Sequence, residues 1–183
     1  MTLTSDPAGS PANSASTSTQ QHRQEAPSSV TCAVLTISDT RNANDDKSGQ
    51  IIRENLDWRG HEVVAYAIVR DDPEGITAQL HEWIARDDIR AIVTNGGTGI
   101  ARRDTTYDVV SRLLDKELTG FGELFRMLSY PEIGAAAMLS RAIAGVSGRT
   151  ALFCLPGSSN AVKLGMEKLV APELAHVVYE MTK

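Results

Sequence analysis

The sequence predicts an α/β protein in which helices cover a parallel sheet. Between residues 30 and 94, runs rich in β-branched residues alternate with segments whose apolar residues recur at helical spacing. Strand, helix, strand, helix, strand is the pattern of right-handed crossovers in a parallel sheet. A glycine run, Asn95-Gly-Gly-Thr-Gly99, follows the third apolar run. Ligands of open α/β sheets bind at this end of the strands.

Residues 1–29 are expected to form a disordered tail, or an added extension, before one folded domain. Ser, Thr, Ala, Pro and Gln dominate this stretch, which has too few large apolar side chains to offset the entropy lost on ordering. Residues 30–183 have the length of a single domain, which can bury about two-thirds of its unfolded surface.

Charge and composition narrow the class of protein. The formal net charge of −5 gives no support to a general nucleic-acid binder, which usually needs a basic face. No apolar run approaches the ~20 residues that span a bilayer, and no secretory or transit signal is recognisable. We therefore expect a cytoplasmic protein whose partners are neither a membrane nor a nucleic acid.

The cysteines and histidines do not indicate a metal site. Cys32 and Cys154 each lie inside an apolar strand-like run, so we interpret them as buried small hydrophobic residues rather than a disulfide or metal pair. The four histidines have no ligand spacing with a partner, and the sequence predicts no structural metal from them: His22, His61, His81 and His176.

The first half of the domain reads as three strands and two helices. A buried strand over 30–37 and a polar loop lead into a helix for which Ser48 is a plausible N-cap. Gly60 suits the position just after that helix ends. The next strand, helix and strand are expected over 62–69, 74–86 and 91–94.

The second half is predicted to contain helices and one hairpin. Thr106 is expected to cap a helix, and two further short helices are expected over 121–129 and 133–139. Ser147-Gly148 is a turn signal between apolar runs, so a hairpin is expected over 142–146 and 150–155. A terminal helical region extends over 161–181, with Pro172 as a candidate break.

The glycine loop has the chemistry of an anion site. Glycines allow positive φ and close approach of the backbone, so successive N–H groups can point at a phosphate. A following helix adds partial positive charge, and Thr98 adds a hydroxyl. The Walker and dinucleotide patterns do not match, because Gly99 precedes Ile-Ala-Arg-Arg. A tight turn without a ligand remains the alternative.

Asp104 favours a cation beside that anion site. A carboxylate there would repel phosphate unless a divalent ion lay between them, and Mg²⁺ commonly binds one or two carboxylates together with phosphate oxygens. Asp71 or Asp72, after the neighbouring strand, is a candidate second ligand. The alternatives are a solvated turn at these two aspartates and simple surface charges at Arg102 and Arg103.

Four segments closely resemble the molybdopterin adenylyltransferase family, nearest to its branch of molybdenum cofactor biosynthesis proteins designated B. G-G-T-G with R-D, then F-G-E, S-R and L-P-G form a specific ordered signature, and the similarity extends from Leu35 to the C-terminus. The segments are NGGTGIARRDTTYDVV, LTGFGELFRMLSYPEIG, LSRAIAGV and LPGSSNAV, which start at Asn95, Leu118, Leu139 and Leu155.

The resemblance implies a three-layer α/β/α molybdopterin-binding fold that assembles as a trimer or hexamer. It implies a reaction in which Mg²⁺-ATP and molybdopterin give adenylyl-molybdopterin and pyrophosphate, with possible hand-over of the product to a separate molybdate-insertion protein. The alternative is a non-catalytic molybdopterin-binding or scaffolding protein of the same fold. An enzyme of the later metal-insertion step normally carries extra domains, for which this chain is too short.

The same resemblance implies the site residues. The two functionally important acidic positions of the family fall on Asp71 and Asp104, which we expect to hold or position Mg²⁺. The other implied residues wrap phosphate or line the nucleotide and pterin pockets, and they are Gly96, Gly97, Thr98, Gly99, Ser38, Asp39, Lys47, Arg103, Glu123, Ser140, Arg141, Pro156, Gly157 and Ser158.

Overall fold

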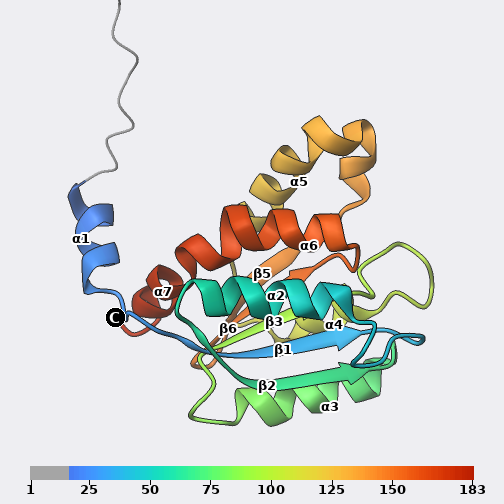
Figure 1. Cartoon of the computed structure of the whole chain (residues 1–183), viewed down its shortest axis with the longest axis horizontal. Coiled ribbons are helices and arrows are strands. Elements are labelled where there is room, and N and C mark those ends of the chain that lie inside the picture. Colours follow the sequence, from blue (N-terminus) through green and yellow to red (C-terminus); the bar gives the residue numbers. More distant parts are fainter. Residues whose placement is uncertain (1–16) are drawn as a thin grey trace, which may run out of the picture.

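The structure, a computed structural model, describes residues 17–183 and contains a six-stranded sheet of order β2-β1-β3-β6-β5-β4 (Figure 1). β2, β1, β3 and β6 are parallel neighbours. β5 runs antiparallel to β6, and the short edge strand β4 runs antiparallel to β5. The strands are β1 Thr31–Ile37, β2 Glu62–Val69, β3 Ala91–Asn95, β4 Lys116–Glu117, β5 Ile143–Ser147 and β6 Thr150–Leu155.

Two helical layers enclose the sheet (Figure 1). One face is covered by α2 Lys47–Trp58, α5 Thr119–Ile133, α6 Ser159–Gly165 and α7 Ala171–Glu180, and the other by α3 Pro73–Ile84 and α4 Thr106–Leu113. Successive side chains of a strand point to opposite faces. Cys32 and Val34 accordingly join the first core, and Ala33 and Leu35 the second. The predicted three-layer α/β/α fold with a mostly parallel sheet is confirmed.

Asp46, rather than Ser48, caps α2. The Asp46 carboxylate accepts a hydrogen bond from the Gly49 N–H at 3.0 Å, which satisfies a free donor of the first turn. Ser48 is the second helical residue, and its hydroxyl donates to the Gly157 carbonyl instead. Gly60, with φ +79°, follows the C-cap Arg59 as predicted.

The C-terminal helical region is continuous where the sequence suggests a break. α6 passes through a π-helical segment, Met166–Val170, directly into α7. Pro172 lies in the first turn of α7. The wider π turn before it lets the chain continue past a residue that lacks an N–H. Before this region, α5 runs to Ile133, and the predicted helix over 133–139 is the 3-10 helix η1, Gly134–Leu139.

The hairpin of β5 and β6 is confirmed, with its turn one residue later than expected. Ser147 pairs with Thr150, so the two loop residues are Gly148 and Arg149. Gly148 has φ +56°, a conformation that favours glycine. β4 was not predicted, because two charged residues carry no strand pattern of their own and pair only through β5.

Part of the predicted disordered tail is helical. Residues Thr17–Glu25 form α1, which packs on α7 beside the C-terminus (Figure 1). An Arg23–Glu173 ion pair and a hydrogen bond from Tyr179 to Glu25 join the two helices. A helix that supplies charged partners to α7 can order with little apolar surface of its own. Residues 1–16 lie outside the described part of the chain.

Both cysteines are free and buried, as the sequence indicates. Burial raises the pKa of each thiol, Cys32 and Cys154, to about 12, because the thiolate would lose its hydration. Neither is therefore ionised at neutral pH. Among the described residues, no helix combines the length and apolarity needed to cross a bilayer.

Folding stability is expected to fall on acidification through His61. Its ring is buried, and Nδ1 accepts a hydrogen bond from the Val30 N–H at 3.3 Å. Burial lowers the pKa of His61 below 6.5, so the unfolded chain binds the proton first. The neutral ring therefore contributes stability that is present above pH 6.5 and is lost as pH falls from 6.5 through the folded pKa.

The measurement is urea unfolding between about pH 7.5 and 5.5, bracketing the ordinary histidine pKa. We expect His61→Gln to flatten the decline in the free energy of unfolding relative to the wild type. His81 is exposed on α3, and His81→Gln should leave the slope unchanged. A His61→Gln profile parallel to that of the wild type would contradict the assignment.

Candidate functional site

Four loops meet at one edge of the sheet, beyond the carboxyl ends of the parallel strands. We call this edge the rim. Ser38 and Asp39 follow β1, Asp71 follows β2, Asn95–Gly99 follow β3, and Pro156–Ser158 follow β6. The parallel pairing of these strands places the four loops at the same edge. A Cβ on Gly157 would lie 3.0 Å from the Gly96 Cα, so two of the loops touch.

The glycine loop, Asn95–Gly99, packs so closely that side chains are excluded. Gly96 has φ +99° and its N–H donates to the Leu155 carbonyl at 3.1 Å. A Cβ on Gly96 would come closer than 3.0 Å to the Ile37 carbonyl oxygen. Gly97 also has positive φ, +61°. The loop thus approaches its neighbours at backbone distance, which only residues without a side chain allow.

Two carboxylates from separate loops lie against this glycine loop. A Cβ on Gly97 would be 2.6 Å from Asp71 Oδ2, and one on Gly99 would be 3.0 Å from Asp104 Cγ. Asp71 Oδ1 accepts from the Thr105 hydroxyl at 3.0 Å. Asp104 Oδ2 accepts from the Ala101 N–H at 2.9 Å. Within residues 17–183, these hydrogen bonds engage one oxygen of each carboxylate and leave Asp71 Oδ2 and Asp104 Oδ1 without one.

The structure distinguishes Asp71 from Asp72. Asp72 Oδ2 accepts from the Gly75 N–H at 2.8 Å and caps α3, so its carboxylate serves the helix. The Asp71 N–H donates to Asp39 Oδ1 at 3.2 Å, which joins the loops after β1 and β2. Asp71, and not its neighbour, therefore faces the glycine loop.

Arg141 brings a positive charge to the loop from the start of β5. Its Nη1 donates to the Gly99 carbonyl at 3.2 Å, and Nη2 forms an ion pair with Asp108 at 2.7 Å. Its guanidinium lies over the Tyr107 ring, 4.2 Å from the centroid. These three contacts hold the side chain in place beside the loop.

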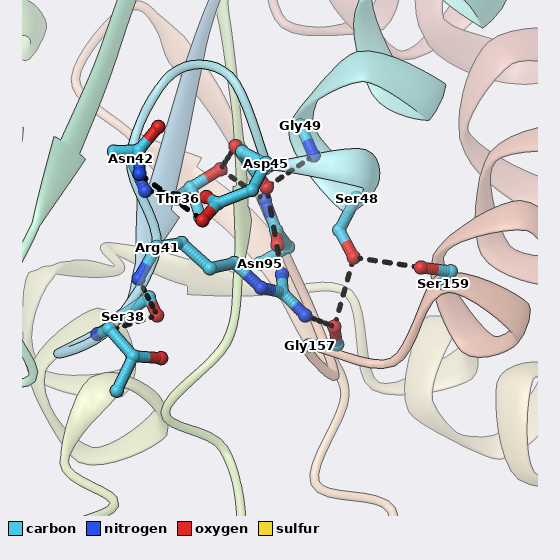
Figure 2. A network of polar contacts seen from close by, with 12 residues as sticks. Thr36, Ser38, Arg41, Asn42, Asp45, Ser48, Gly49, Asn95, Gly157 and Ser159 are labelled. Atoms are coloured by element: carbon cyan, nitrogen blue, oxygen red, sulfur yellow. Dashed lines mark hydrogen bonds and ion pairs between the residues drawn. The ribbon is translucent and has the colours of Figure 1, made fainter.

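Beneath the rim lies a buried carboxylate that sequence reasoning missed, Asp46 (Figure 2 shows the surrounding network). Asp46 Oδ2 accepts from Thr36 Oγ1 at 2.5 Å and from the Tyr66 hydroxyl at 2.8 Å. The Thr36 hydroxyl in turn accepts from Asn95 Nδ2 at 2.9 Å. Burial and the Asp46 carboxylate raise the pKa of Tyr66 to about 12. The network links β1, β2 and the first residue of the glycine loop.

A second arm of the network reaches the loop after β6. Arg41 lies 3.6 Å from Asp46 Oδ1 and donates from Nη2 to the Gly157 carbonyl at 3.3 Å. The Ser48 hydroxyl donates to the same carbonyl at 3.0 Å (Figure 2). A sequence signal for Asp46 did exist. An N-cap side chain usually accepts a hydrogen bond from the N–H two or three residues later, and Asp46 lies three residues before Gly49. Arg41 carried no comparable signal.

Lys47, Arg103, Glu123 and Ser140 are among the predicted residues that no contact found in residues 17–183 brings to the glycine loop. Lys47, Arg103 and Glu123 are exposed, and no hydrogen bond or ion pair in this range joins them to the loop. Ser140 takes part through its backbone, since its carbonyl accepts from Arg126 Nη1 at 3.4 Å. Their roles toward a ligand stay predictions.

The donor set fits a hard cation beside phosphate. Mg²⁺ takes oxygen ligands and is usually bound by one or two carboxylates plus phosphate oxygens, which Asp71 and Asp104 beside a glycine loop provide. Three buried side-chain atoms, Thr94 Oγ1, Asn95 Oδ1 and Thr106 Oγ1, have no hydrogen-bond partner within the described chain. Buried polar atoms of this kind occur where a ligand or water completes a site. Thr106 Oγ1 adjoins Gly97.

A separate hollow lies away from the glycine loop. About 670 Å³ is open between α2 and the edge strand β2, lined among others by Arg53, Asp57, His61 and Tyr66. No residue of the glycine loop lines it, and its wall is largely the open side of a strand. We assign the candidate site to the rim, because the glycine loop and the carboxylates of Asp71 and Asp104 lie together there.

Comparison with known proteins identifies the family to which this chain is similar. The family model described as a probable molybdopterin binding domain matches residues 33–176. Molybdenum cofactor biosynthesis protein B of Bacillus cereus is 52% identical over 165 residues, 90% of this chain and 98% of that protein. The same-named protein of Halalkalibacterium halodurans is 56% identical over 167 residues, 91% and 98% of the two chains.

A solved structure extends the similarity to three dimensions. A crystal structure of molybdenum cofactor biosynthesis protein B superposes with a TM-score of 0.83 at 53% identity, covering 86% of this chain and 98% of that one. The family model spans most of the folded chain, and the relatives match over nearly their whole length. On this similarity of sequence and fold, this chain belongs to the family of the probable molybdopterin binding domain, in the group of the molybdenum cofactor biosynthesis B proteins.

Proposed function

We propose that the chain acts in molybdenum cofactor biosynthesis, where it adenylylates molybdopterin with Mg²⁺-ATP and releases pyrophosphate. The family model and the named relatives support the process and the pterin as substrate. One observation carries the reaction itself. Asp71 and Asp104, from separate loops, lie against the same glycine loop. Two carboxylates beside an anion cradle suit a metal-bound phosphate chain.

In this proposal each residue of the site either binds a substrate or the metal ion, or positions a residue that does. Asp71 and Asp104 hold Mg²⁺, which when bound neutralises charge on the phosphate oxygens of ATP. The N–H groups of Gly97, Thr98 and Gly99 and the Thr98 hydroxyl bind phosphate oxygens, whereas the Gly96 N–H is already bonded to the Leu155 carbonyl. Arg141 positions the loop through the Gly99 carbonyl and adds positive charge beside it. The buried Asp46 network keeps Asn95 in register below.

The chemical step needs no protein nucleophile. An oxygen of the terminal phosphate of molybdopterin forms a bond to the α-phosphorus of ATP. The bond from that phosphorus to the oxygen bridging to the β-phosphate breaks, and pyrophosphate leaves with the electron pair. Catalysis then consists of alignment and charge neutralisation. The adenylylated pterin would pass to a separate molybdate-insertion protein.

The test mixes purified chain with molybdopterin and Mg²⁺-ATP and follows pyrophosphate. We expect release that requires all three components and stops on chelation of the metal. Pterin binding measured in parallel, without release of pyrophosphate, would overturn the enzymatic proposal and favour a binding or scaffolding role.

We further propose that the chain forms a homo-oligomer through α5 and η1. These elements lie at the outside of the molecule, above α6 in the view of Figure 1. Large apolar side chains on these elements are between about half and three-quarters exposed, and they are Leu124, Met127, Tyr130, Ile133, Met138 and Leu139. Contiguous exposed apolar surface of this kind marks interaction sites. An interface between copies of the chain would bury it.

Met127→Glu is expected to shift the oligomer toward the monomer, because a buried carboxylate without a partner opposes association. Light scattering coupled to size-exclusion chromatography measures the mass. The control is Ala78→Glu, which adds the same charge at an exposed position of α3 on the other side of the sheet. A Met127→Glu protein with the mass of the wild type would exclude this surface as the interface.

A further inference from the structure

Two histidines that are 154 positions apart in sequence meet where α1 packs on α7. His22 lies on α1, whereas His176 and Glu180 lie one turn apart on α7. One ligand atom from each of the three lies within 4.8 Å of the others. The sequence did not group these residues, because His22 lies far along the chain from His176 and Glu180. Only the packing of α1 creates the group.

Glu180 lies between the two imidazoles. His22 Nδ1 is 2.7 Å from Glu180 Oε1, and His176 Nε2 is 3.6 Å from the same oxygen. His22 and His176 are about one-third and one-fifth exposed, so both rings are partly shielded from water. Two imidazoles and a carboxylate are the protein ligands of many zinc sites with an open fourth position.

A second carboxylate orients one of the imidazoles. His176 Nδ1 lies 2.9 Å from Glu173 Oε2, which leaves Nε2 facing Glu180. Histidine ligands of metals usually donate their other ring N–H to such a carboxylate, which fixes the ring and raises its basicity. Glu173 is therefore a positioning residue. An ion-pair clasp between α1 and α7 does not by itself explain why His176 is held at both nitrogens.

The local charge also favours a dication. Among residues 17–183, the contacts of this group and its neighbours involve three carboxylates, those of Glu25, Glu173 and the group member Glu180, and two cations, Arg23 and Lys183. We propose that His22, His176 and Glu180 form a zinc(II) site that fastens α1 to α7. It is remote from the rim, because α1 lies near the amino ends of β1 and β3, where Glu25, Thr31, Arg90 and Tyr179 share one hollow.

Zinc binding would require the Glu180 side chain to rotate, because its Oε1 lies only 2.7 Å from His22 Nδ1. Tetrahedral ligands at zinc are roughly 3.4 Å apart, given bonds of ~2.0–2.1 Å. Glu180 is largely exposed and can move aside from its Lys183 contact, so that the two imidazoles and one carboxylate oxygen face a common centre. Imidazole donors favour zinc over Mg²⁺, which prefers oxygen ligands alone.

The test titrates untagged full-length protein with ZnCl₂ by calorimetry, with MgCl₂ in parallel. We expect one Zn²⁺ per chain and no saturable Mg²⁺ binding at this site. His22→Gln and His176→Gln should each weaken Zn²⁺ binding at least about 10-fold, and Glu173→Gln by about 10- to 100-fold, as for other outer partners of metal ligands. His81→Gln, on exposed α3, serves as the matched histidine control.

A second readout follows the docking of α1. Arg23 lies within α1, so trypsin cleavage after it reports release of the helix. Zn²⁺ should slow this cleavage in the wild type and in His81→Gln but not in His22→Gln, which controls for effects of zinc on the protease. Absence of saturable Zn²⁺ binding, or binding unchanged in both His22→Gln and His176→Gln, would show that the group is only an ion-pair clasp.

Discussion

Asp104→Asn is expected to release pyrophosphate from Mg²⁺-ATP and molybdopterin at least about 100-fold more slowly than the wild type. Metal ions stabilise transferred phosphoryl charge by several kcal/mol, and each 1.36 kcal/mol corresponds to a tenfold change in rate. The asparagine keeps the size of the side chain, and its oxygen can still accept from the Ala101 N–H, 2.9 Å from the native carboxylate. The substitution therefore removes the charge and leaves the loop contact.

The control for this variant lies one residue from the other carboxylate. Asp72→Asn changes an exposed aspartate that caps α3, and its side chain can still accept from the Gly75 N–H. Its rate should equal that of the wild type. Pterin affinity of Asp104→Asn, measured by equilibrium binding, should remain within about threefold, well under the tenfold that 1.4 kcal/mol represents. Undiminished turnover by Asp104→Asn would remove Asp104 from the metal site.

Gly96→Ala is expected to lower the free energy of unfolding by about 3 kcal/mol. The residue has φ +99°, which is unfavourable for an L side chain by about 1–2 kcal/mol. The added Cβ would also come closer than 3.0 Å to the Ile37 carbonyl oxygen, which belongs to rigid backbone. Forced overpacking adds about 1–3 kcal/mol. Equilibrium unfolding in urea measures the change.

Gly60→Ala separates the two causes. Gly60 also has positive φ, +79°, but a Cβ there would meet nothing within 4 Å. Its loss of stability should be about 1 kcal/mol, from backbone strain alone. Equal losses in the two variants would mean that Ile37 moves away freely, and that close packing of the glycine loop contributes little to the fold.

Most of the fold could be predicted because its signals are local. The β-branched runs, the helical spacing of apolar residues and the glycine after α2 act within one element, and each matched the structure. Asp46 was missed as the cap because Ser48 satisfies the same local rule. β4 was missed because two residues pair only when β5 is already in place.

The candidate site was predictable in outline and not in detail. The chemistry at the strand ends identified the glycine loop and the aspartates. Which of Asp71 and Asp72 contacts the glycine loop depends on the cap of α3. Asp72 caps this helix, and Asp71 is left to face the loop. The Asp46 network and the Arg41 contact with Gly157 depend on side-chain direction across loops far apart in sequence.

The sequence by itself determined the order and type of the elements and the polar chemistry beyond each parallel strand, because these follow from periodicity and from conformational preferences of neighbouring residues. Tertiary structure alone decided which carboxylate adjoins the glycine loop, that Asp46 is buried below it, and that α1 brings His22 to His176. Such choices depend on packing between distant segments, and no local pattern encodes which side chains then meet.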